Sequence, residues 1–164
     1  MSLTFPLLAQ LPEFVPLVAM WLFDEWGHER PGSSLEALTK DISSKLDTTT
    51  LPIQMLALVD ELPVGVAILK PHEMKDIFPD RTPWLGSVVV APAHRGKGIG
   101  TALTREIEAL ALRRGFTRLY LQTERQDGGV YARLGWQTCD QLPYRGYHAN
   151  VMSKQLGPAQ GDQV

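Results

Sequence analysis

The chain has 164 residues, of which 44% are hydrophobic and 21% are charged, and its formal net charge is -2. This is the composition of an ordinary globular protein, and the slight negative charge argues against a nucleic-acid partner, which requires a basic face. A single cysteine, Cys139, excludes an internal disulfide bond and favours a reducing, cytoplasmic location.

The N-terminal segment is rich in apolar residues, yet it lacks the basic start and the small-residue cleavage site of a signal peptide. Three prolines and a glutamate interrupt it, at Pro6, Pro12, Glu13 and Pro16. No stretch reaches the roughly 18 apolar residues that a membrane span requires. We therefore expect no membrane partner.

The first half of the chain predicts two helices and four strands. A short strand over 3–9 precedes a helix over 11–26, in which apolar residues recur at helical spacing. Ser33 or Ser34 is the expected N-cap of a second helix over 34–46. A hairpin over 51–70, a loop over 71–83 and a strand over 84–90 follow.

The second half begins with a glycine-rich segment that leads into a third helix. One stripe of that helix is apolar and consists of Ile99, Leu103, Ile107, Leu110 and Ala111. Gly115 is the expected end of the helix. A strand over 116–123, a short helix over 130–134 and a hairpin over 136–156 complete the pattern.

This order of elements, β-α-α-β-β-β-α-β-α-β-β, predicts a mixed α/β fold in which helices pack on a sheet. No internal repeat and no linker divides the pattern. We expect a single domain over residues 1–156, followed by a polar, loosely ordered tail over 157–164.

The segment between the strand over 84–90 and the third helix suits the binding of an anion. The start of a helix exposes unpaired main-chain N–H groups and carries about half a positive charge. Glycines there allow an anion to contact these groups directly. Gly96, Gly98 and Gly100 provide that space, and Arg95 and Lys97 add positive charge. The pattern predicts a cradle for a pyrophosphate group that needs no metal.

Two nucleotide-binding motifs do not fit this segment. A P-loop requires G-x-x-x-x-G-K-[ST], and the dinucleotide fingerprint requires G-x-G-x-x-G, whereas the glycines here are spaced by two and two. A tight strand-to-helix turn without a ligand is the other alternative. One or two glycines are enough for such a turn. This alternative does not account for the third glycine or for the positive charges of Arg95 and Lys97 beside it.

The residues Arg95, Gly98 and Gly100 match the motif R-x-x-G-x-G, and on this motif the chain resembles the GNAT superfamily of acetyl-CoA-dependent N-acetyltransferases. A second stretch, "VYARLGW", is similar to another signature of the family, in which a tyrosine lies four residues before a glycine. Tyr131 and Gly135 occupy those positions. The predicted order of elements extends the resemblance over nearly the whole chain.

The resemblance implies a largely antiparallel mixed sheet of six to seven strands with a V-shaped splay, flanked by about four helices. It also implies acetyl-CoA as cosubstrate and no metal. The main chain of the strand before the loop would pair with the pantetheine arm, one amide would polarise the acetyl carbonyl, and the loop would hold the pyrophosphate. The cofactor-binding residues are then Val88, Val89, Val90, Arg95, Gly96, Lys97, Gly98, Ile99, Gly100 and Thr101.

The same resemblance makes Tyr131 the expected general acid, which protonates the departing thiolate when an amine attacks the thioester directly. Seen alone on a short helix, this tyrosine would be read as an ordinary amphipathic core residue. Many relatives have an asparagine about seven residues earlier, where this chain has Glu124. Two glycines, Gly128 and Gly129, also replace the usual helical start there and predict a looser segment.

The general base is not assigned by the resemblance, because the strand over 84–90 contains no acid. An ordered water is one alternative. The candidate side chains are Asp24, Glu25, Glu73, Asp76 and His148.

The acceptor is expected to be a primary amine on a small molecule. Acidic residues such as Asp24, Glu25 and Glu73 would suit a cationic amine. A protein N-terminus or lysine is the alternative acceptor, and a CoA-binding relative without catalysis is the alternative function. The first two helices with "DEWGHERPGSS", the loop over 71–83 and the late hairpin with "PYRGYH" are expected to wall the acceptor site. Homodimers are common in relatives, and the sequence leaves the oligomeric state open.

Overall fold

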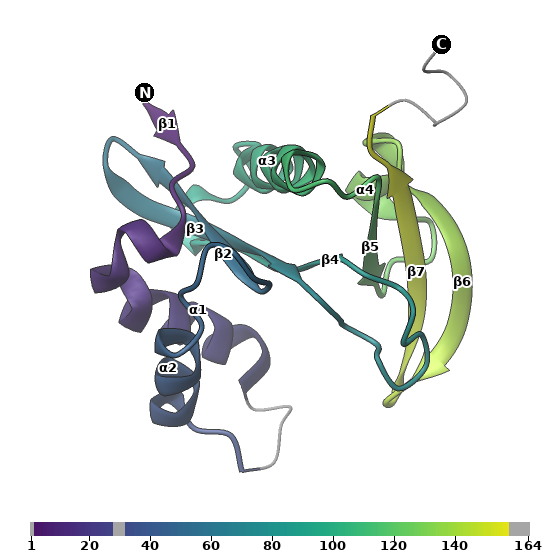
Figure 1. The fold of residues 1–164 in the computed structure, drawn as a ribbon, viewed down its shortest axis with the longest axis horizontal. Helices are drawn as coiled ribbons and strands as arrows, with labels where there is room; N and C mark the ends of the chain where they lie inside the picture. Colours follow the sequence, from purple (N-terminus) through teal and green to yellow (C-terminus); the bar gives the residue numbers. More distant parts are fainter. Residues whose placement is uncertain (1, 28–31, 158–164) are drawn as a thin grey trace. The chain divides into compact units, whose positions relative to one another are not determined.

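The computed structural model describes residues 2–27 and 32–157 (Figure 1). These residues form seven strands and four α-helices, in the order expected from the sequence. The strands are β1 (Leu3–Thr4), β2 (Ile53–Val59), β3 (Leu62–Lys70), β4 (Trp84–Val90), β5 (Arg118–Thr123), β6 (Gln137–Tyr144) and β7 (Tyr147–Gln155). The helices are α1 (Val15–Trp26), α2 (Leu35–Ser43), α3 (Ile99–Arg113) and α4 (Gly129–Arg133).

The strands form one mixed sheet in the order β1-β2-β3-β4-β5-β7-β6. The pairs β1–β2, β2–β3, β5–β7 and β6–β7 are antiparallel, and β4 and β5 are parallel. The parallel pair is registered at Trp84 with Tyr120. The expected fold class is therefore confirmed, while the V-shaped splay stays a prediction.

The chain divides into two compact units. The first contains Met1–Leu69 and Ser87–Glu106, and the second contains Lys70–Gly86 and Ile107–Val164. The division passes along the chain through β4 and α3. The single domain over 1–156 stays a prediction, and the predicted tail lies outside the described residues except for Gly157.

In the first unit, α1 and α2 lie on one side of β2 and β3, and the beginning of α3 lies on the other (Figure 1). The α1–α2 side is an apolar core formed by Leu8, Val15, Val18, Ala19, Leu22, Ile42, Leu56, Leu58, Val66, Ile68 and Val89. The Ser34 hydroxyl accepts a hydrogen bond from the N–H of Ala37 at 3.0 Å, so the predicted cap of α2 is confirmed.

The side of the sheet that faces α3 depends on a glycine in β3. A Cβ at Gly65 would lie 3.0 Å from the Val89 carbonyl oxygen and 3.1 Å from Cδ1 of Leu103. Gly65 thus allows the first turns of α3 to pack closely on the strands. The predicted apolar stripe of α3 is buried throughout, because none of its five residues exposes more than 4% of its surface.

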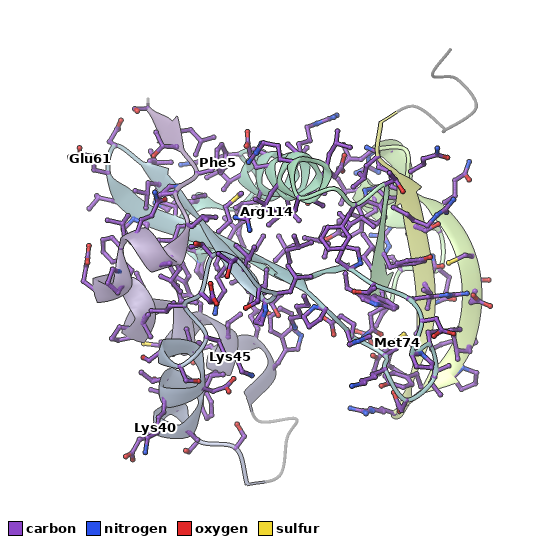
Figure 2. All side chains as sticks on the ribbon, viewed as in Figure 1. Phe5, Lys40, Lys45, Glu61, Met74 and Arg114 are labelled. Carbon is purple, nitrogen blue, oxygen red and sulfur yellow. The ribbon has the colours of Figure 1, made fainter. Side chains whose placement is uncertain are left out.

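The second unit has its own core beneath β5, β7 and β6. Met74, Trp84, Tyr144, Ala149 and Val151 pack together, and each of them is buried. Met74, labelled in Figure 2, anchors the long loop between β3 and β4, which contains no strand or helix. The loop is therefore fixed by a completely buried side chain rather than by secondary structure.

The sequence was wrong about the end of the first strand and the start of the first helix. The strand predicted over 3–9 is limited to Leu3–Thr4, and a 3-10 helix follows at Leu8–Gln10. The helix predicted from residue 11 begins at Val15, after a second 3-10 helix at Pro12–Phe14. Prolines lack the N–H that a helix or a sheet would use, so they are accommodated at the starts of these short turns.

None of the helices in residues 2–27 and 32–157 is both long enough and apolar enough to cross a membrane. The cytoplasmic location and the absence of a nucleic-acid partner stay predictions.

Candidate active site

The glycine-rich loop lies between the end of β4 and the start of α3, in the first unit. A 3-10 helix at Pro92–His94 follows β4, and the chain then turns through Gly96 at φ +77° and Gly98 at φ +83°. Both angles lie in the left-handed region, which residues with a Cβ adopt only with strain. Two of the three glycines are therefore required by the backbone of the loop itself.

The third glycine, Gly100, has a different role. It lies in the first turn of α3 with no positive φ, and a Cβ there would be 3.7 Å from Cγ2 of Val90, an ordinary contact. The backbone would accept alanine at this position, so glycine is not required here by the turn.

The start of α3 presents a row of free hydrogen-bond donors. Within the described part of the chain, no protein acceptor is found for the main-chain N–H groups from Gly96 to Thr101. The first N–H with a partner is that of Ala102, which donates to the Gly98 carbonyl at 3.0 Å. Because α3 has 15 residues, its dipole adds to these donors. Such an arrangement binds phosphate-like anions.

The guanidinium of Arg95 is bound by other protein groups rather than left free beside these donors. Its Nε donates to the Val90 carbonyl at 2.9 Å, and its Nη2 lies 2.9 Å from Oε1 of Glu25 at the end of α1. The guanidinium thus fastens the loop to the end of β4 and to α1, a contact that the sequence did not predict. Lys97 is exposed, and no ion-pair partner is found for it in the described residues.

The strand before the loop contains a local irregularity. Ser87, in the middle of β4, has φ +52°, which for a residue with a side chain is an uncommon and strained value. After it, Val89 is buried, whereas Val88 and Val90 are half-buried. The main chain at Ser87 therefore departs from regular strand geometry, just before the residues expected to pair with the pantetheine arm.

Tyr131 lies in the second unit, on α4. It is half-buried, and its ring meets that of Trp136 edge-on, with centroids 6.2 Å apart. Its hydroxyl has no hydrogen-bond partner in the described residues, and burial raises the pKa of the phenol above its usual value. The phenol is therefore protonated at neutral pH and has its proton available to donate.

The segment before α4 is not loose in the way that its two glycines suggest. Gly128 has φ +81° and Gly129 has φ +53°, so both adopt conformations that favour glycine. Gly128 is also buried, and a Cβ there would lie 2.8 Å from Cε of Met152. These glycines are required by a tightly packed turn. Glu124, at the position of the usual asparagine, is exposed.

Three of the five candidate bases already have strong partners. Glu25 is paired with Arg95, and Glu73 is paired with Lys70 at 3.0 Å. Asp76 accepts a hydrogen bond from the Tyr144 hydroxyl at 2.9 Å, which lowers the pKa of its carboxyl group. A lowered pKa makes a carboxylate a weaker base. Asp24 and His148 are exposed.

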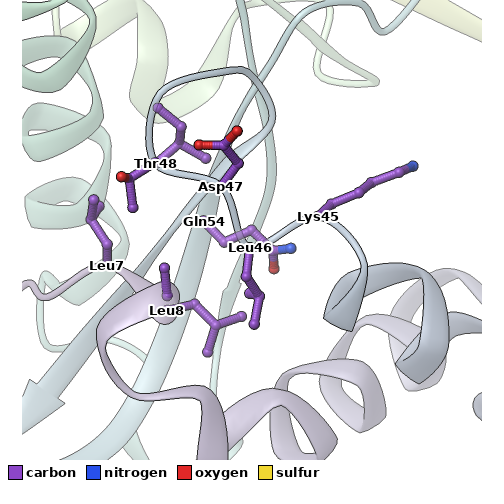
Figure 3. Close-up of a pocket in the computed structure, with 9 residues that line it drawn as sticks. Leu7, Leu8, Lys45, Leu46, Asp47, Thr48 and Gln54 are labelled. Carbon is purple, nitrogen blue, oxygen red and sulfur yellow. The ribbon is translucent and has the colours of Figure 1, made fainter.

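Each unit has a hollow on its surface. The hollow in the first unit, shown in Figure 3, is lined by Leu8, Leu46 and Gln54 among others and has a volume of about 10 Å³, the scale of one water molecule. The hollow in the second unit is open, measures about 430 Å³ and is lined by His72, Glu73, Lys75, Asp76 and Arg145. It brings together the loop over 71–83 and the β6–β7 turn, two of the three segments expected to wall the acceptor site. The third includes "DEWGHERPGSS", of which residues 28–31 lie outside the described residues.

The sequence missed one buried polar residue beside α4. Asn150 on β7 is fully buried, and its side-chain Nδ2 donates to the Arg125 carbonyl at 3.0 Å. The only signal in the sequence is that Asn150 is a polar residue within the apolar run "ANVM". The alternation of polar and apolar residues along the strand would by itself place Asn150 on the solvated face of the hairpin.

The fold matches solved acetyltransferase structures over almost its whole length. A structure of aminoglycoside 6'-acetyltransferase type Ii has a TM-score of 0.73 at 22% identity and covers 97% of this chain and 99% of its own. An aminoglycoside 6'-N-acetyltransferase complexed with coenzyme A has a TM-score of 0.73 at 18% identity, with the same coverage of 97% and 99%. The Salmonella typhimurium protein yncA, solved with its cofactor acetyl-CoA, has a TM-score of 0.73 at 17% identity and covers 98% and 97%.

No curated protein matches the sequence. The model of the acetyltransferase (GNAT) family, in contrast, matches residues 15–136, which include both the glycine-rich loop and Tyr131. The chain therefore belongs to the GNAT acetyltransferase family.

Proposed function

We propose that the protein transfers the acetyl group of acetyl-CoA to a primary amine of a small molecule by direct attack. The observation that carries this proposal is the row of N–H groups from Gly96 to Thr101, which have no acceptor among the described residues, at the start of a long helix. Main-chain donors arranged in this way suit the pyrophosphate of a coenzyme without any metal.

The residues that would hold acetyl-CoA lie on two consecutive segments of the chain. The main chain of Val88–Val90 would pair with the amides of the pantetheine arm, and the loop Arg95–Thr101 would hold the pyrophosphate. Lys97 adds positive charge beside the donors, whereas Arg95 fixes the loop through its bonds to Val90 and Glu25. One amide of the strand would stabilise the negative charge that develops on the carbonyl oxygen, a device worth about 3–4 kcal/mol in measured enzymes.

Acetyl-CoA supplies a thioester, and its reaction with an amine forms an N–C bond and breaks the C–S bond. Tyr131 is the proposed source of the proton that converts the departing thiolate to a thiol. A phenol of pKa ~10 is a slightly weaker acid than a thiol of pKa ~8.5, so the transfer is favoured only where a free thiolate is poorly solvated. The half-buried position of Tyr131 and its unpartnered hydroxyl suit that role.

We assign no side chain as general base. The carboxylates of Glu25, Glu73 and Asp76 are engaged in ion pairs or hydrogen bonds. The reaction is therefore expected to use the fraction of the acceptor that is already a neutral amine. Water then takes the proton that this amine loses after it attacks. The cytoplasm, where acetyl-CoA meets small amines, is the expected location.

Aminoglycosides are the first acceptors to test, because two similar structures are those of aminoglycoside 6'-acetyltransferases. The experiment incubates the protein with acetyl-CoA and a panel of amines, namely aminoglycosides, polyamines, amino acids and lysine-containing peptides, and measures free thiol together with product mass. Calorimetry with CoA alone measures binding.

We expect CoA to bind and at least one small amine to be acetylated. Acetylation of peptides alone would overturn the small-molecule acceptor. Binding of CoA without turnover of any amine would indicate the non-catalytic alternative, and failure to bind CoA would overturn the proposal altogether.

A further inference from the structure

Helix α4, which carries Tyr131, is too short to set its own orientation. It has five residues, and isolated helices are marginal even at lengths of about 12–15 residues. The direction of the Tyr131 side chain must therefore depend on what holds the two ends of α4 in place.

One face of β7 contacts the whole segment around α4. Asn150, Met152 and Lys154 are spaced by two along the strand, so their side chains project from the same face. Asn150 binds the turn before the helix, Met152 packs under Gly128, and Lys154 Nζ donates to the Leu134 carbonyl at 2.7 Å, just after the helix.

Asn150 provides the fixed point at the start of this segment. Its Nδ2 donates to the Arg125 carbonyl at 3.0 Å and lies 3.4 Å from the Gln126 carbonyl. The residue pairs with Thr123 in the register of β5 and β7, so it stands where β5 ends and the turn begins. It is completely buried, and its Oδ1 has no partner in the described residues.

A buried amide with one unsatisfied atom is an unfavourable choice for packing alone. Its neighbours in the strand, Ala149, Val151 and Met152, are apolar and equally buried, so a residue of that kind would fill the position at less cost. What the amide provides, and an apolar side chain does not, is a donor directed at the carbonyl groups of the turn.

The same turn is held by two further side chains. Gln126 Nε2 donates to the His148 carbonyl at 3.0 Å, and Gln141 Nε2 donates to the Gln126 carbonyl at 3.1 Å. Both bonds are exposed, whereas that of Asn150 is partly buried and comes from a completely buried side chain, so water competes with it less. Asn150 is therefore the donor with the greatest effect on where the turn lies.

We infer that Asn150 is a positioning residue for Tyr131: its amide fixes the turn 125–128, the turn fixes the start of α4, and α4 directs the phenol. This inference rests on the proposed role of Tyr131 as general acid. The placement of the phenol is nevertheless measurable without any turnover, so the two can fail separately.

The first test measures structure and requires no acceptor. Asn150→Ala is compared with Ser153→Ala, which removes a partly buried hydrogen bond with Arg118 from the same strand and leaves the turn untouched. The readouts are hydrogen exchange of amides 125–134 and the NMR titration of carbon-13-labelled tyrosine, with the Tyr131 signal assigned by its loss in Tyr131→Phe.

We expect exchange in 125–134 to be at least tenfold faster in Asn150→Ala than in Ser153→Ala, and the pKa of Tyr131 to fall toward its ordinary value of 10.0 as the ring becomes solvated. An unchanged Tyr131 titration, or an increase in exchange no greater than in Ser153→Ala, would overturn the inference.

A second variant, Asn150→Asp, keeps the shape of the side chain and adds a titration. A neutral carboxyl group can still donate one hydrogen bond to the turn, whereas a carboxylate would repel the carbonyl oxygens, and burial raises the pKa of such a group. We expect fast exchange in 125–134 at pH 8 and slow exchange, corrected for intrinsic rates, at pH 5. The same protection at both pH values would contradict the role of the donor. This variant also covers the case in which Asn150→Ala does not fold.

The link to chemistry is tested with the amine found active in the panel. Asn150→Ala is expected to lower kcat about tenfold with little change in the KM for acetyl-CoA, and to have no further effect in a Tyr131→Phe background. An equal loss in both backgrounds would show that Asn150 does not act through Tyr131. If Tyr131→Phe retains full kcat while Asn150→Ala still shifts the Tyr131 titration, the positioning stands and the general-acid assignment fails.

Discussion

Backbone conformation is one reason for a glycine, and the glycines of the loop before α3 differ in whether that reason applies. Gly98 has φ +83°, and nothing lies within 4 Å of a Cβ built on it, so its constraint is conformational alone. Gly100 has neither a positive φ nor a close contact. The glycines of this loop should therefore respond differently to the same substitution.

Gly98→Ala is expected to destabilise the protein by about 1–2 kcal/mol and to weaken CoA binding, because alanine is strained in the left-handed region. Gly100→Ala, the matched control for stability, is expected to raise the free energy of unfolding by up to about 1 kcal/mol, since alanine favours a helix. Urea unfolding and calorimetry measure both quantities. Equal losses in the two variants would contradict this account of the loop.

Tyr131→Phe is expected to lower kcat by about 10²–10⁴-fold, the usual contribution of a general acid, while leaving the Kd for CoA nearly unchanged. Phenylalanine keeps the edge-on contact with the Trp136 ring, so the fold should not respond. Steady-state kinetics with the active amine, together with calorimetry, check the two parts. Full turnover in this variant would remove Tyr131 from the chemistry.

The pH dependence of kcat/KM should be set by deprotonation of the acceptor at low pH and by deprotonation of Tyr131 at high pH. kcat/KM is expected to rise about tenfold per pH unit while the acceptor is an ammonium ion, because only its neutral form attacks. Burial raises the pKa of Tyr131 above 10.0, so its proton is lost, and activity falls, only above that pH. A fall centred below pH 10.0 that disappears in Tyr131→Phe would contradict the raised pKa.

At the scale of elements, α4 is held at its C-terminal end by a largely buried ion pair. Lys154 Nζ lies 2.7 Å from Oε1 of Glu108 on α3, and the other oxygen of this carboxylate accepts from the Trp136 indole at 3.2 Å. The side chains of Lys154 and Glu108 are only 20% and 12% exposed. The pair thus connects three elements of the second unit at one point.

Glu108→Gln is expected to lower the free energy of unfolding by about 2 kcal/mol, between the values typical of exposed and of fully buried pairs, because it leaves the Lys154 ammonium without its counter-ion. Asp41→Asn is the control. It removes the ion pair between Asp41 and Lys45, whose side chains are 54% and 51% exposed, and should cost no more than about 0.5 kcal/mol. Urea denaturation measures both, and equal effects would contradict the importance of burial.

The elements themselves could be predicted because their signals are local. The apolar stripe of α3, the Ser34 cap of α2 and the order of all eleven helices and strands follow from residues a few positions apart. The contacts of Arg95 with Glu25, and of Asn150 with Arg125, join residues far apart in the sequence. No periodicity or motif encodes such pairs, so the fastening of the loop and of α4 emerged only from the structure.

At the scale of the whole molecule, a ligand that binds the folded chain and not the unfolded one must raise its stability. The donors from Gly96 to Thr101 depend on the left-handed turn before α3, which the unfolded chain does not maintain. CoA binding and folding are therefore thermodynamically linked.

CoA at 100 times its Kd is expected to stabilise the protein by about 2.7 kcal/mol, which for a chain of this size corresponds to a rise in Tm of about 5–10 °C. Differential scanning fluorimetry across a CoA titration measures the rise. Dephospho-CoA, which keeps the pyrophosphate, should produce a comparable rise if the loop is the main contact, and pantetheine, which lacks it, a much smaller one. Equal rises with CoA and pantetheine would contradict the role of the loop.

The free donors at the start of α3 also affect how this loop should be surveyed by mutagenesis. An alanine scan leaves every peptide nitrogen with its hydrogen, so a position such as Thr101 would pass as tolerant. Proline deletes that hydrogen, and the first turn of a helix is where a chain accepts proline most readily. Thr101→Pro would therefore remove one N–H contact to the anion while the chain still folds. A survey of alanine variants alone would not detect that contact.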